Sequence, residues 1–475
     1  MTASTTTAAD TKISQEALAQ LRMTIRGDVL TPDDADYAGV RPAYNAMHPG
    51  HPAVVVRPSG TADVVDAVNF AREQGLLVAV RGGGHSVAGL SSVDGGMLID
   101  LANMRAVEVD ADARVAHVQG GALLGDVDRE TQLFGLVAPG GVVSDTGIAG
   151  LALGGGEGWV RRKYGLSCDN IVSAQVVCAD GVVRTASAKT NPDLYWGIRG
   201  GGGNFGVVTS MTFQLHPHGP IVAFAGVFYP ISDAANIYRQ FRDWAANAPD
   251  EVSALCGCTS LPPHEGLPPQ IHDTPFIVCG GVYVGDPDEG MKVMQPLRDF
   301  GTPLVDISGP MPFVGVQAAF DPFFVRGTLR SYWKSTYLNE LTDEAIDIIA
   351  RKVPERPSKR TFAPIAFLMG GAINKVKPKD TAYSERSAKW LISIDGNWED
   401  PADDAKVIPW VRETWAEFAK LGTGSVYLNF TSLENEPTSQ SVDDAFGDNM
   451  RRLAEIKSKY DPTNFFRLNN NIAPA

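Results

Sequence analysis

Six consecutive residues, Arg81-Gly82-Gly83-Gly84-His85-Ser86, restrict the fold of this chain more than any other segment. They follow the apolar run 77–80, which predicts a buried strand. Three successive glycines carry no Cβ, so their backbone N–H groups can close around an anion such as a pyrophosphate. The segment therefore offers an anion site beside a nucleophilic imidazole, His85. The alternative is a glycine-rich turn that contains an ordinary polar histidine.

Four further blocks rich in glycine and aromatic residues follow in a fixed order. They are GIAGLALGGGEG at 147–158, KYGL at 163–166, LYWGIRG at 194–200 and YDPTNFFRLN at 460–469. Together with RGGGHS, these blocks resemble the berberine bridge enzyme-like oxidases, which lie within the vanillyl-alcohol oxidase and p-cresol methylhydroxylase superfamily of FAD proteins. The resemblance spans residues 81–469.

This resemblance implies an α+β protein with the two-domain FAD-binding fold of the p-cresol methylhydroxylase type. Residues 1–217 would form the FAD-binding domain, and 218–430 a substrate-binding domain built on an antiparallel sheet backed by helices. The C-terminal segment 431–475 would return to the FAD domain. A length of 475 residues agrees with two large domains, because single hydrophobic cores stop growing well below it.

The cofactor that the resemblance implies is FAD, bonded covalently to His85 through a ring methyl group. Some relatives carry a second flavin bond from a cysteine, but the corresponding place here is Val143. FAD is therefore expected on His85 alone, and Cys168 is expected to be a packed residue. The other positions assigned to FAD are Arg81, Gly82, Gly83, Gly84, Ser86, Thr146, Gly147, Gly150, Gly154, Val208, Asn469 and Asn471.

Two other cofactor classes find no support in the sequence. Cys256 and Cys258 form the only close cysteine pair, without a histidine or second pair at zinc-finger distance, so no metal site is expected. Gly201-x-Gly203-x-x-Gly206 fits a dinucleotide fingerprint literally. However, it leads into the alternating run 207–215, which predicts a strand where the fingerprint requires a helix. A nicotinamide site is therefore not expected there.

One candidate catalytic residue is Glu157, directly after the second triple glycine, where the family places an active-site side chain and where tyrosine or an aliphatic residue is commoner. A glutamate beside the flavin could act as a base or bind a cationic amine, since burial would raise its pKa. The alternative is a loop carboxylate paired with Arg161 or Arg162.

A second set of active-site side chains is expected on a strand at 426–430. Many family members have a tyrosine base after the asparagine of this strand, whereas here Asn429 precedes Phe430. Tyr427 therefore becomes a candidate base, with packing in the core as the alternative. Asn429 is expected in the catalytic site and Phe430 against the substrate.

Apolar periodicity places the remaining elements. The strand 390–394 resembles a strand that lies over the flavin in the family, and Trp390, Ile392 and Ile394 share one face of it, which would form an apolar substrate wall. Helical spacing predicts helices near 61–71, 123–133, 342–352, 412–420 and 442–460.

The charge balance limits the partners. With 41 basic and 55 acidic residues the net charge is −14, so a nucleic-acid surface is not expected. The chain has no uninterrupted apolar run of about 18 residues, so no membrane-spanning helix is expected. Its first 22 residues lack a basic start followed by an apolar run, which predicts a cytoplasmic protein without a secretory signal.

We therefore expect an FAD-linked oxidase that abstracts hydride from an alcohol, amine or sugar-type small molecule and reduces molecular oxygen to hydrogen peroxide. Relatives act on sugars, alkaloid amines, aromatic alcohols and polyketide glycosides, and the sequence does not choose among these substrates. One alternative is a flavin dehydrogenase with another electron acceptor. The other is a non-redox member in which FAD is structural and the pocket binds or cyclises a ligand.

Overall fold

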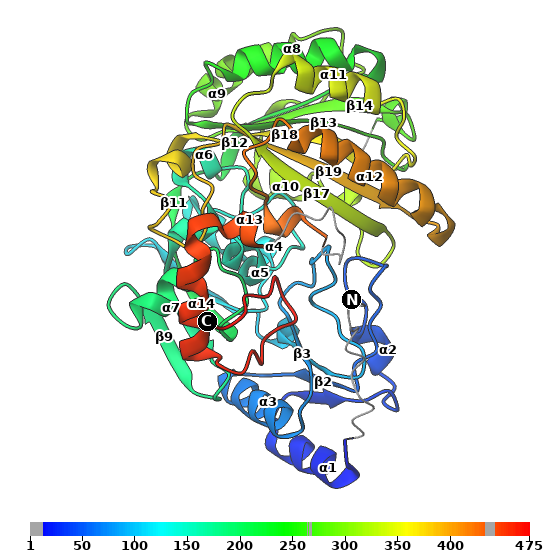
Figure 1. Ribbon diagram of the computed structural model, residues 1–475. Helices are drawn as coiled ribbons and strands as arrows, with labels where there is room; N and C mark the ends of the chain where they lie inside the picture. Colours follow the sequence, from blue (N-terminus) through cyan, green and yellow to red (C-terminus); the bar gives the residue numbers. More distant parts are fainter. Residues whose placement is uncertain (1–12, 264, 266–267, 433–441) are drawn as a thin grey trace.

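A large antiparallel sheet covered by helices lies above two smaller sheets in the computed structural model (Figure 1), which describes residues 13–263, 265, 268–432 and 442–475. This arrangement confirms the α+β fold class. The smaller sheets use strands between residues 28 and 214, and the large sheet uses strands between residues 221 and 398. The change of sheet falls next to the expected domain boundary at 217, and the exact division of the chain stays a prediction. No helix in the described ranges is long and apolar enough to cross a lipid bilayer.

The N-terminal sheet carries the glycine loop. Its order is β1 (Asp28–Leu30), β2 (Val54–Arg57), β4 (Met97–Asp100) and β3 (Val78–Arg81), with the last three strands parallel. Parallel strands need a crossover, and α3 (Thr61–Glu73) supplies it. This helix forms because Val64, Ala67, Val68 and Ala71 recur at helical spacing, and all four are buried. The arrangement delivers residues 82–86 at the end of β3.

A second, antiparallel sheet follows. Its order is β5 (Val107–Asp110), β6 (Val115–Gln119), β10 (Val207–Gln214), β8 (Ile171–Val177) and β9 (Val183–Ser187). The run Gly201–Gly206 leads directly into β10 and opens no helix, as the alternating pattern predicted. Two short strands, β7 (Leu136–Val137) and β11 (His216–Pro217), form a separate pair. Helices α4 (Leu124–Thr131) and α5 (Ile148–Leu153) lie between β6 and β8 in the chain.

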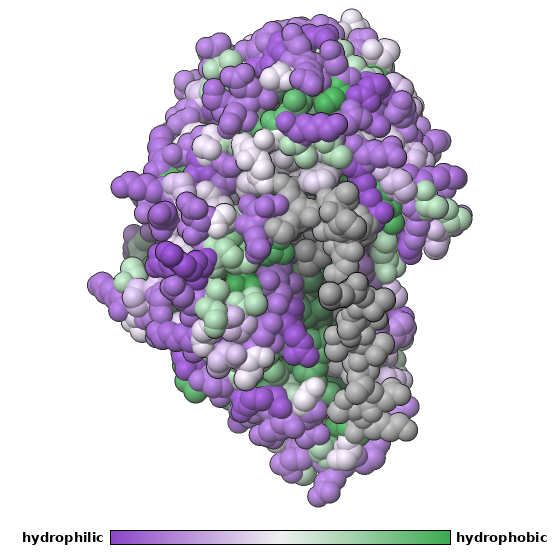
Figure 2. Space-filling view, in the orientation of Figure 1, coloured by the Kyte–Doolittle hydropathy of each residue, from purple (hydrophilic) through white to green (hydrophobic). Residues whose placement is uncertain are grey.

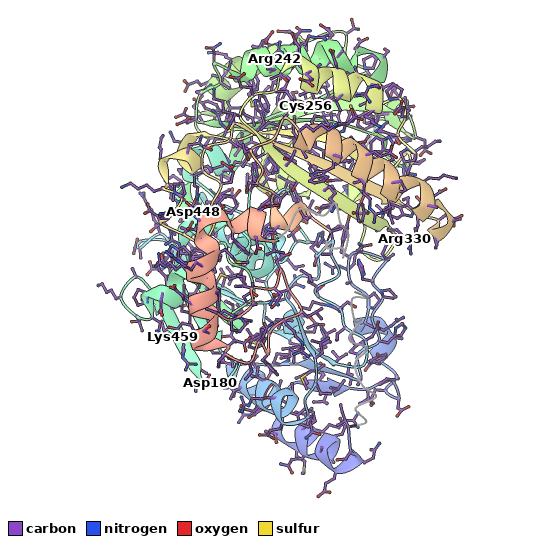
Figure 3. All side chains as sticks on the ribbon, in the orientation of Figure 1. Asp180, Arg242, Cys256, Arg330, Asp448 and Lys459 are labelled. Atoms are coloured by element: carbon purple, nitrogen blue, oxygen red, sulfur yellow. The ribbon has the colours of Figure 1, made fainter. Side chains whose placement is uncertain are left out.

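The large sheet has the order β15 (Val305–Asp306), β12 (Ile221–Pro230), β14 (Phe276–Tyr283), β13 (Val252–Thr259), β18 (Phe362–Leu368), β19 (Trp390–Trp398) and β17 (Arg330–Leu338), and β16 (Gly309–Pro312) also pairs with β12. Helices α8 (Ala234–Ala245), α11 (Asp343–Lys352) and α12 (Asp404–Ala419) pack on one face (Figure 1). The other face turns toward the smaller sheets. Cys256, labelled in Figure 3, lies in this sheet and is buried.

The predicted orientation of β19 is wrong. Trp390 and Ile392 belong to the core between the sheet and its helices, where Trp390 meets Phe241 of α8 edge-on with ring centroids 5.7 Å apart. They therefore form no substrate wall, and the opposite residues, Leu391 and Asp395, face the smaller sheets. Every residue of β19 is buried, including the polar set Ser393, Asp395 and Asn397, so the usual alternation of buried apolar and exposed polar residues does not tell which face lines the site.

The segment 426–430 is also not the strand that the sequence predicts. Leu428–Phe430 forms one turn of 3₁₀ helix after an extended Tyr427. The predicted helix at 442–460 is two helices, α13 (Val442–Phe446) and α14 (Met450–Tyr460), separated by a 3₁₀ turn at Gly447–Asn449. Gly447 has φ +48°, a left-handed conformation that interrupts an α-helix.

The C-terminal segment packs against the N-terminal half of the chain. Helix α14 lies beside α7 (Pro192–Gly197), as Figure 1 shows. Lys457 is wholly buried with Asp461, and its ammonium group donates to the Asp461 carboxylate at 2.7 Å and to the Asn204 carbonyl at 2.7 Å. The Phe466 carbonyl accepts a third bond at 2.9 Å. One buried cation thus ties residues 461–466 to the loop before β10.

Replacing Lys457 by methionine should destabilise the protein by about 3–5 kcal/mol, because the Asp461 carboxylate would remain buried without its counter-ion. The matched control is Lys459→Met, two residues along the same helix (Figure 3), where the exposed pair with Asp193 should contribute less than about 1 kcal/mol. Chemical denaturation followed by circular dichroism measures both free energies of unfolding. Equal losses for the two variants would contradict this account of the C-terminal segment.

Candidate active site

One cavity extends from the glycine loop of the N-terminal sheet to the inner face of the large sheet. Figure 2 shows a hollow in the middle of this face of the molecule, with apolar residues inside it. The lower lining comes from residues 82–86 after β3, the segment around α5, the glycines before β10 and residues 466–470. The upper lining comes from β13, β17, β18 and β19, and from the loop 320–324. The site thus joins segments that are far apart in the sequence.

The glycine loop leaves its backbone donors free to bind a ligand. No hydrogen bond of the described residues uses the N–H groups of Gly83, Gly84 or His85, and Gly84 has φ +73°. A Cβ on Gly83 would lie 2.1 Å from the Gly147 nitrogen, and a Cβ on Gly147 would lie 2.1 Å from the Gly83 nitrogen. The two loops therefore cross with their backbones in contact, which only glycine allows. The result is a set of free N–H groups beside the cavity, suited to an anion.

Most of the expected FAD positions line this cavity. They are Gly82, Gly83, Gly84, His85, Ser86, Thr146, Gly147, Gly150, Gly154, Val208 and Asn469. Asn471 does not line it, whereas its neighbour Asn470 does. Arg81 lies behind the loop, where its guanidinium donates to the carbonyls of Val40, Arg41 and Ser91 and so fixes the loop start. Arg81 thus positions the loop from outside the cavity.

Three consecutive asparagines near the C-terminus fit a cofactor rich in N–H donors and acceptors. The Oδ1 atoms of Asn469, Asn470 and Asn471 are buried, and none has a hydrogen-bond partner among the described residues. Buried polar atoms are rarely left unpaired, so the oxygens of Asn469 and Asn470, which line the cavity, favour a ligand that supplies donors. Val143 also lines the cavity, while Cys168 is buried in the core outside its lining.

His85 is held on two sides. Its ring stacks on Tyr44 with centroids 4.6 Å apart and an interplanar angle of 14°, and its Nε2 is hydrogen-bonded to an Asp145 carboxylate oxygen. The other Asp145 oxygen lies 3.1 Å from Arg326. Burial alone would raise the pKa of Asp145, but His85 and Arg326 together hold that pKa below its ordinary value. An ionised carboxylate on Nε2 therefore fixes the ring and leaves Nδ1 as its other nitrogen.

Two buried carboxyl groups border the upper part of the cavity, and we refer to Glu157 and Asp395 as the carboxyl pair. Glu157 is 2% exposed, lies 3.3 Å from the Arg161 guanidinium, and has no hydrogen-bond donor on either oxygen among the described residues. Burial raises the pKa of Glu157, and Arg161 opposes that rise. The expected pairing with Arg161 is thus present while Glu157 still lines the cavity.

Asp395 is a candidate site residue that the sequence analysis did not name. It is 3% exposed and accepts a hydrogen bond from the Ser393 hydroxyl. Burial raises the pKa of Asp395 to about 8, with the Ser393 hydroxyl opposing the rise and the Glu157 charge adding to it. One signal was its place in the chain, since Asp395 directly follows the apolar strand run 390–394. A charged residue inside a wholly buried strand needs a functional or structural reason.

Tyr427 lies behind the cavity rather than in its lining. Its hydroxyl oxygen accepts hydrogen bonds from the backbone N–H of Gly156 at 2.9 Å and from the Asn429 amide at 3.0 Å. Burial raises the pKa of Tyr427 above the ordinary value of a tyrosine. The side chain therefore fixes the loop that presents Glu157, which agrees with the packing alternative. Asn429 and Phe430 line the cavity, and the Asn429 amide also donates to the Leu151 carbonyl at 3.0 Å.

The wall opposite the glycine loop is aromatic. The rings of Phe324, Trp333, Phe430 and Phe367 follow one another with centroids 5.7–5.9 Å apart. Phe320 and Phe362 stack at 6.3 Å and complete what we call the aromatic wall. The Trp333 indole N–H is already bonded to Asn397, so this wall presents ring faces and edges to a ligand.

Comparison with known proteins places this geometry in a family. Residues 52–187 match the model of an FAD binding domain, and residues 426–473 match the berberine and berberine-like model. An FAD-linked oxidoreductase of Dictyostelium discoideum is 30% identical, with 95% of each chain covered. The chain belongs to the berberine bridge enzyme-like FAD-linked oxidoreductases. It is therefore an FAD-binding oxidoreductase, and the expected family and fold type are confirmed.

Other members of this berberine bridge enzyme-like family act on different molecules. Chitooligosaccharide oxidase of Gibberella zeae is 30% identical, over 91% of this chain and 89% of that enzyme. The crystal structure of 6-hydroxy-D-nicotine oxidase from Arthrobacter nicotinovorans superposes with a TM-score of 0.84 at 27% identity, covering 98% of this chain and 100% of the other. Similar chains thus include an oxidase named for chitooligosaccharides and an oxidase named for 6-hydroxy-D-nicotine.

Substituting alanine for Gly83 should abolish most FAD binding, because the added Cβ would force the loops at residues 83 and 147 apart. The matched control is Gly39→Ala in the helix Tyr37–Val40, where no atom lies within 4 Å of the new Cβ. The ratio of flavin to protein absorbance in the purified variants measures the effect. Full flavin content in Gly83→Ala would show that the glycine loop is not the cofactor site.

Proposed function

We propose that this protein is an oxidase that removes a hydride and a proton from a small organic molecule and passes the electrons to molecular oxygen, with FAD bonded covalently to His85. One observation carries the proposal: a single cavity connects the free N–H groups of the glycine loop and His85 to a buried carboxyl pair. A bound flavin and a proton acceptor are the two parts that such a reaction needs.

The residues at the lower end of the cavity suit FAD. The N–H groups of Gly83 and Gly84 would hold the pyrophosphate, and the unpartnered oxygens of Asn469 and Asn470 would accept from the flavin or the adenosine. When bound, FAD accepts the hydride. His85 would form the covalent bond, and Asp145 would position the ring and stabilise positive charge on it while that bond forms.

A side chain of the protein itself must accept the proton that the substrate loses. Asp395 is the better acceptor of the carboxyl pair, since a pKa of about 8 matches proton transfer near neutral pH. Glu157 is held by Arg161 and raises the Asp395 pKa by its charge. The aromatic wall would exclude water around both groups, which strengthens every charge interaction inside.

Covalent attachment is tested by acid precipitation. The precipitated protein should remain yellow, and mass spectrometry should find the flavin peptide at His85 only. His85→Ala should bind FAD but release it in acid, and Asp145→Asn should lower the covalently bound fraction because the imidazole loses its carboxylate. Flavin attached to Cys168, or full attachment in Asp145→Asn, would contradict this assignment.

The proton acceptor is tested by anaerobic stopped-flow reduction of the flavin at several pH values. The rate should rise with pH through about 8, because Asp395 must be ionised to accept a proton. Asp395→Asn should slow reduction about 10²–10⁴-fold and remove the inflection. Glu157→Gln should keep an inflection but move it to lower pH, since a neighbouring negative charge is gone.

If the Asp395→Asn variant reduces flavin at the wild-type rate, the proton transfer belongs to another group.

The same substrate then separates an oxidase from a dehydrogenase. One mole of hydrogen peroxide per mole of product in air supports the oxidase. Reoxidation of the reduced flavin by a dye but not by air would contradict it.

A further inference from the structure

The upper part of the cavity holds hydrogen-bond acceptors without donors to match them. Neither oxygen of Glu157 accepts a hydrogen bond from the described residues, although only 2% of the residue is exposed and Oε2 lies 3.3 Å from the Arg161 guanidinium. Buried carboxylate oxygens are costly to leave unpaired. The position therefore calls for a ligand that supplies hydrogen-bond donors.

The donors that line this part of the cavity are already engaged within the protein. The Asn429 amide donates to Leu151 and Tyr427, the Trp333 indole donates to Asn397, and the Thr431 hydroxyl donates to the Tyr427 carbonyl. A ligand with several acceptor oxygens would therefore find only one side-chain donor among these groups, the carboxyl group of Asp395 in its protonated form. A sugar would bury many hydroxyl groups against the aromatic wall with only two carboxyl groups to satisfy them.

The charges of the carboxyl pair and its neighbours do not cancel when both Glu157 and Asp395 are ionised. Arg161 is wholly buried and balances Glu157, and its guanidinium also donates to the carbonyls of Gly158, Ala254 and Leu368. Asp395 has a hydroxyl partner in Ser393, and no cation of the described residues lies within salt-bridge distance of it. When both carboxyl groups are ionised, the negative charge of Asp395 is therefore not neutralised by the protein. The neighbouring aromatic wall can also bind a cation, since the faces of aromatic rings attract positive charge.

We propose that the substrate of this cavity is an aromatic or similarly apolar amine, held as a cation between the carboxyl groups of Glu157 and Asp395. This inference rests on the proposed oxidase function and names its substrate class. The apolar body of the molecule would pack on the aromatic wall, and its N–H groups would donate to the unpartnered oxygens of Glu157. The amine would then give up a proton to Asp395 before its carbon is oxidised.

Such binding is linked to pH. The titratable groups whose charges act on Asp395 are Glu157 from the segment after α5 and Tyr44 from the N-terminal segment, and Glu157 in turn interacts with Arg161 and Tyr427. Burial raises the pKa of both tyrosines well above neutrality, so they stay uncharged. A permanent cation binds better when Asp395 is ionised. Its affinity should therefore rise as pH increases toward about 8 and then level off.

The test is calorimetric titration of the FAD-loaded full chain with three probes between pH 6 and 9. Benzamidine stays protonated in this range, donates N–H groups and has no oxidisable carbon; benzamide is its neutral counterpart, and xylobiose represents a sugar. Benzamidine should bind most tightly, with Kd falling about tenfold per pH unit up to about 8. Benzamide and xylobiose should bind weakly without that pH dependence.

Variants assign the effect to the carboxyl pair. Asp395→Asn should weaken benzamidine binding and remove its pH dependence. The matched control is Asp128→Asn in α4, because Asp128 is also a buried carboxyl with a raised pKa but does not line the cavity. Tighter binding of xylobiose than of benzamidine, or benzamidine binding that does not change with pH in the wild-type protein, would overturn the inference.

The binding experiment tests the amine inference separately from the proposed oxidase function, since none of the three probes needs to be oxidised. If benzamidine binds as expected but no alcohol, amine or sugar reduces the flavin, the cation site stands and the oxidase function fails. If a sugar or alcohol reduces the flavin while benzamidine does not bind, the oxidase function stands and the amine inference fails.

Discussion

The backbone contact between Gly83 and Gly147 is the constraint on which the site depends. It brings a loop from the parallel sheet against the segment that leads into α5, and both positions exclude any side chain. From this crossing the chain runs in one direction to His85 and in the other to the glycines before Glu157. The spacing between His85 and the carboxyl pair is thus set by two loops that cannot separate without losing their packing.

The second constraint on the site is the buried carboxyl pair, which lowers the folding stability of the protein. Burying Glu157 and Asp395 removes both from water, and only Arg161 and Ser393 offer partial compensation among the residues that the structure describes. Tyr427 fixes the loop before Glu157 from behind, which keeps the carboxylate in the cavity. Such an arrangement weakens folding and is retained where it serves binding or proton transfer. The aromatic wall and the carboxyl pair together limit which molecules can use the flavin.

The sequence predicted the parts of the site that local geometry decides. A triple glycine after a buried strand requires a particular backbone, so the residue pattern alone was enough to place the loop at 82–86 and the strand after Gly206. The orientation of β19 could not be predicted, because both of its faces are buried and one of them buries polar residues as well. Tyr427 was expected on a strand, yet its hydroxyl bonds to the loop at Gly156, which lies 271 residues away, decide its position. Asp145 and Asp395 were missed for the same reason, since their partners are distant in sequence or visible only in the folded chain.

The most direct test of this account is a crystal structure of the FAD-loaded protein with benzamidine. We expect continuous electron density from His85 to the flavin inside the cavity, and benzamidine between the aromatic wall and the carboxyl groups of Glu157 and Asp395. A flavin bound away from the loop at 82–86, or a cavity between His85 and Asp395 that stays filled by protein side chains alone, would contradict the central claim that one cavity joins the cofactor site to the carboxyl pair.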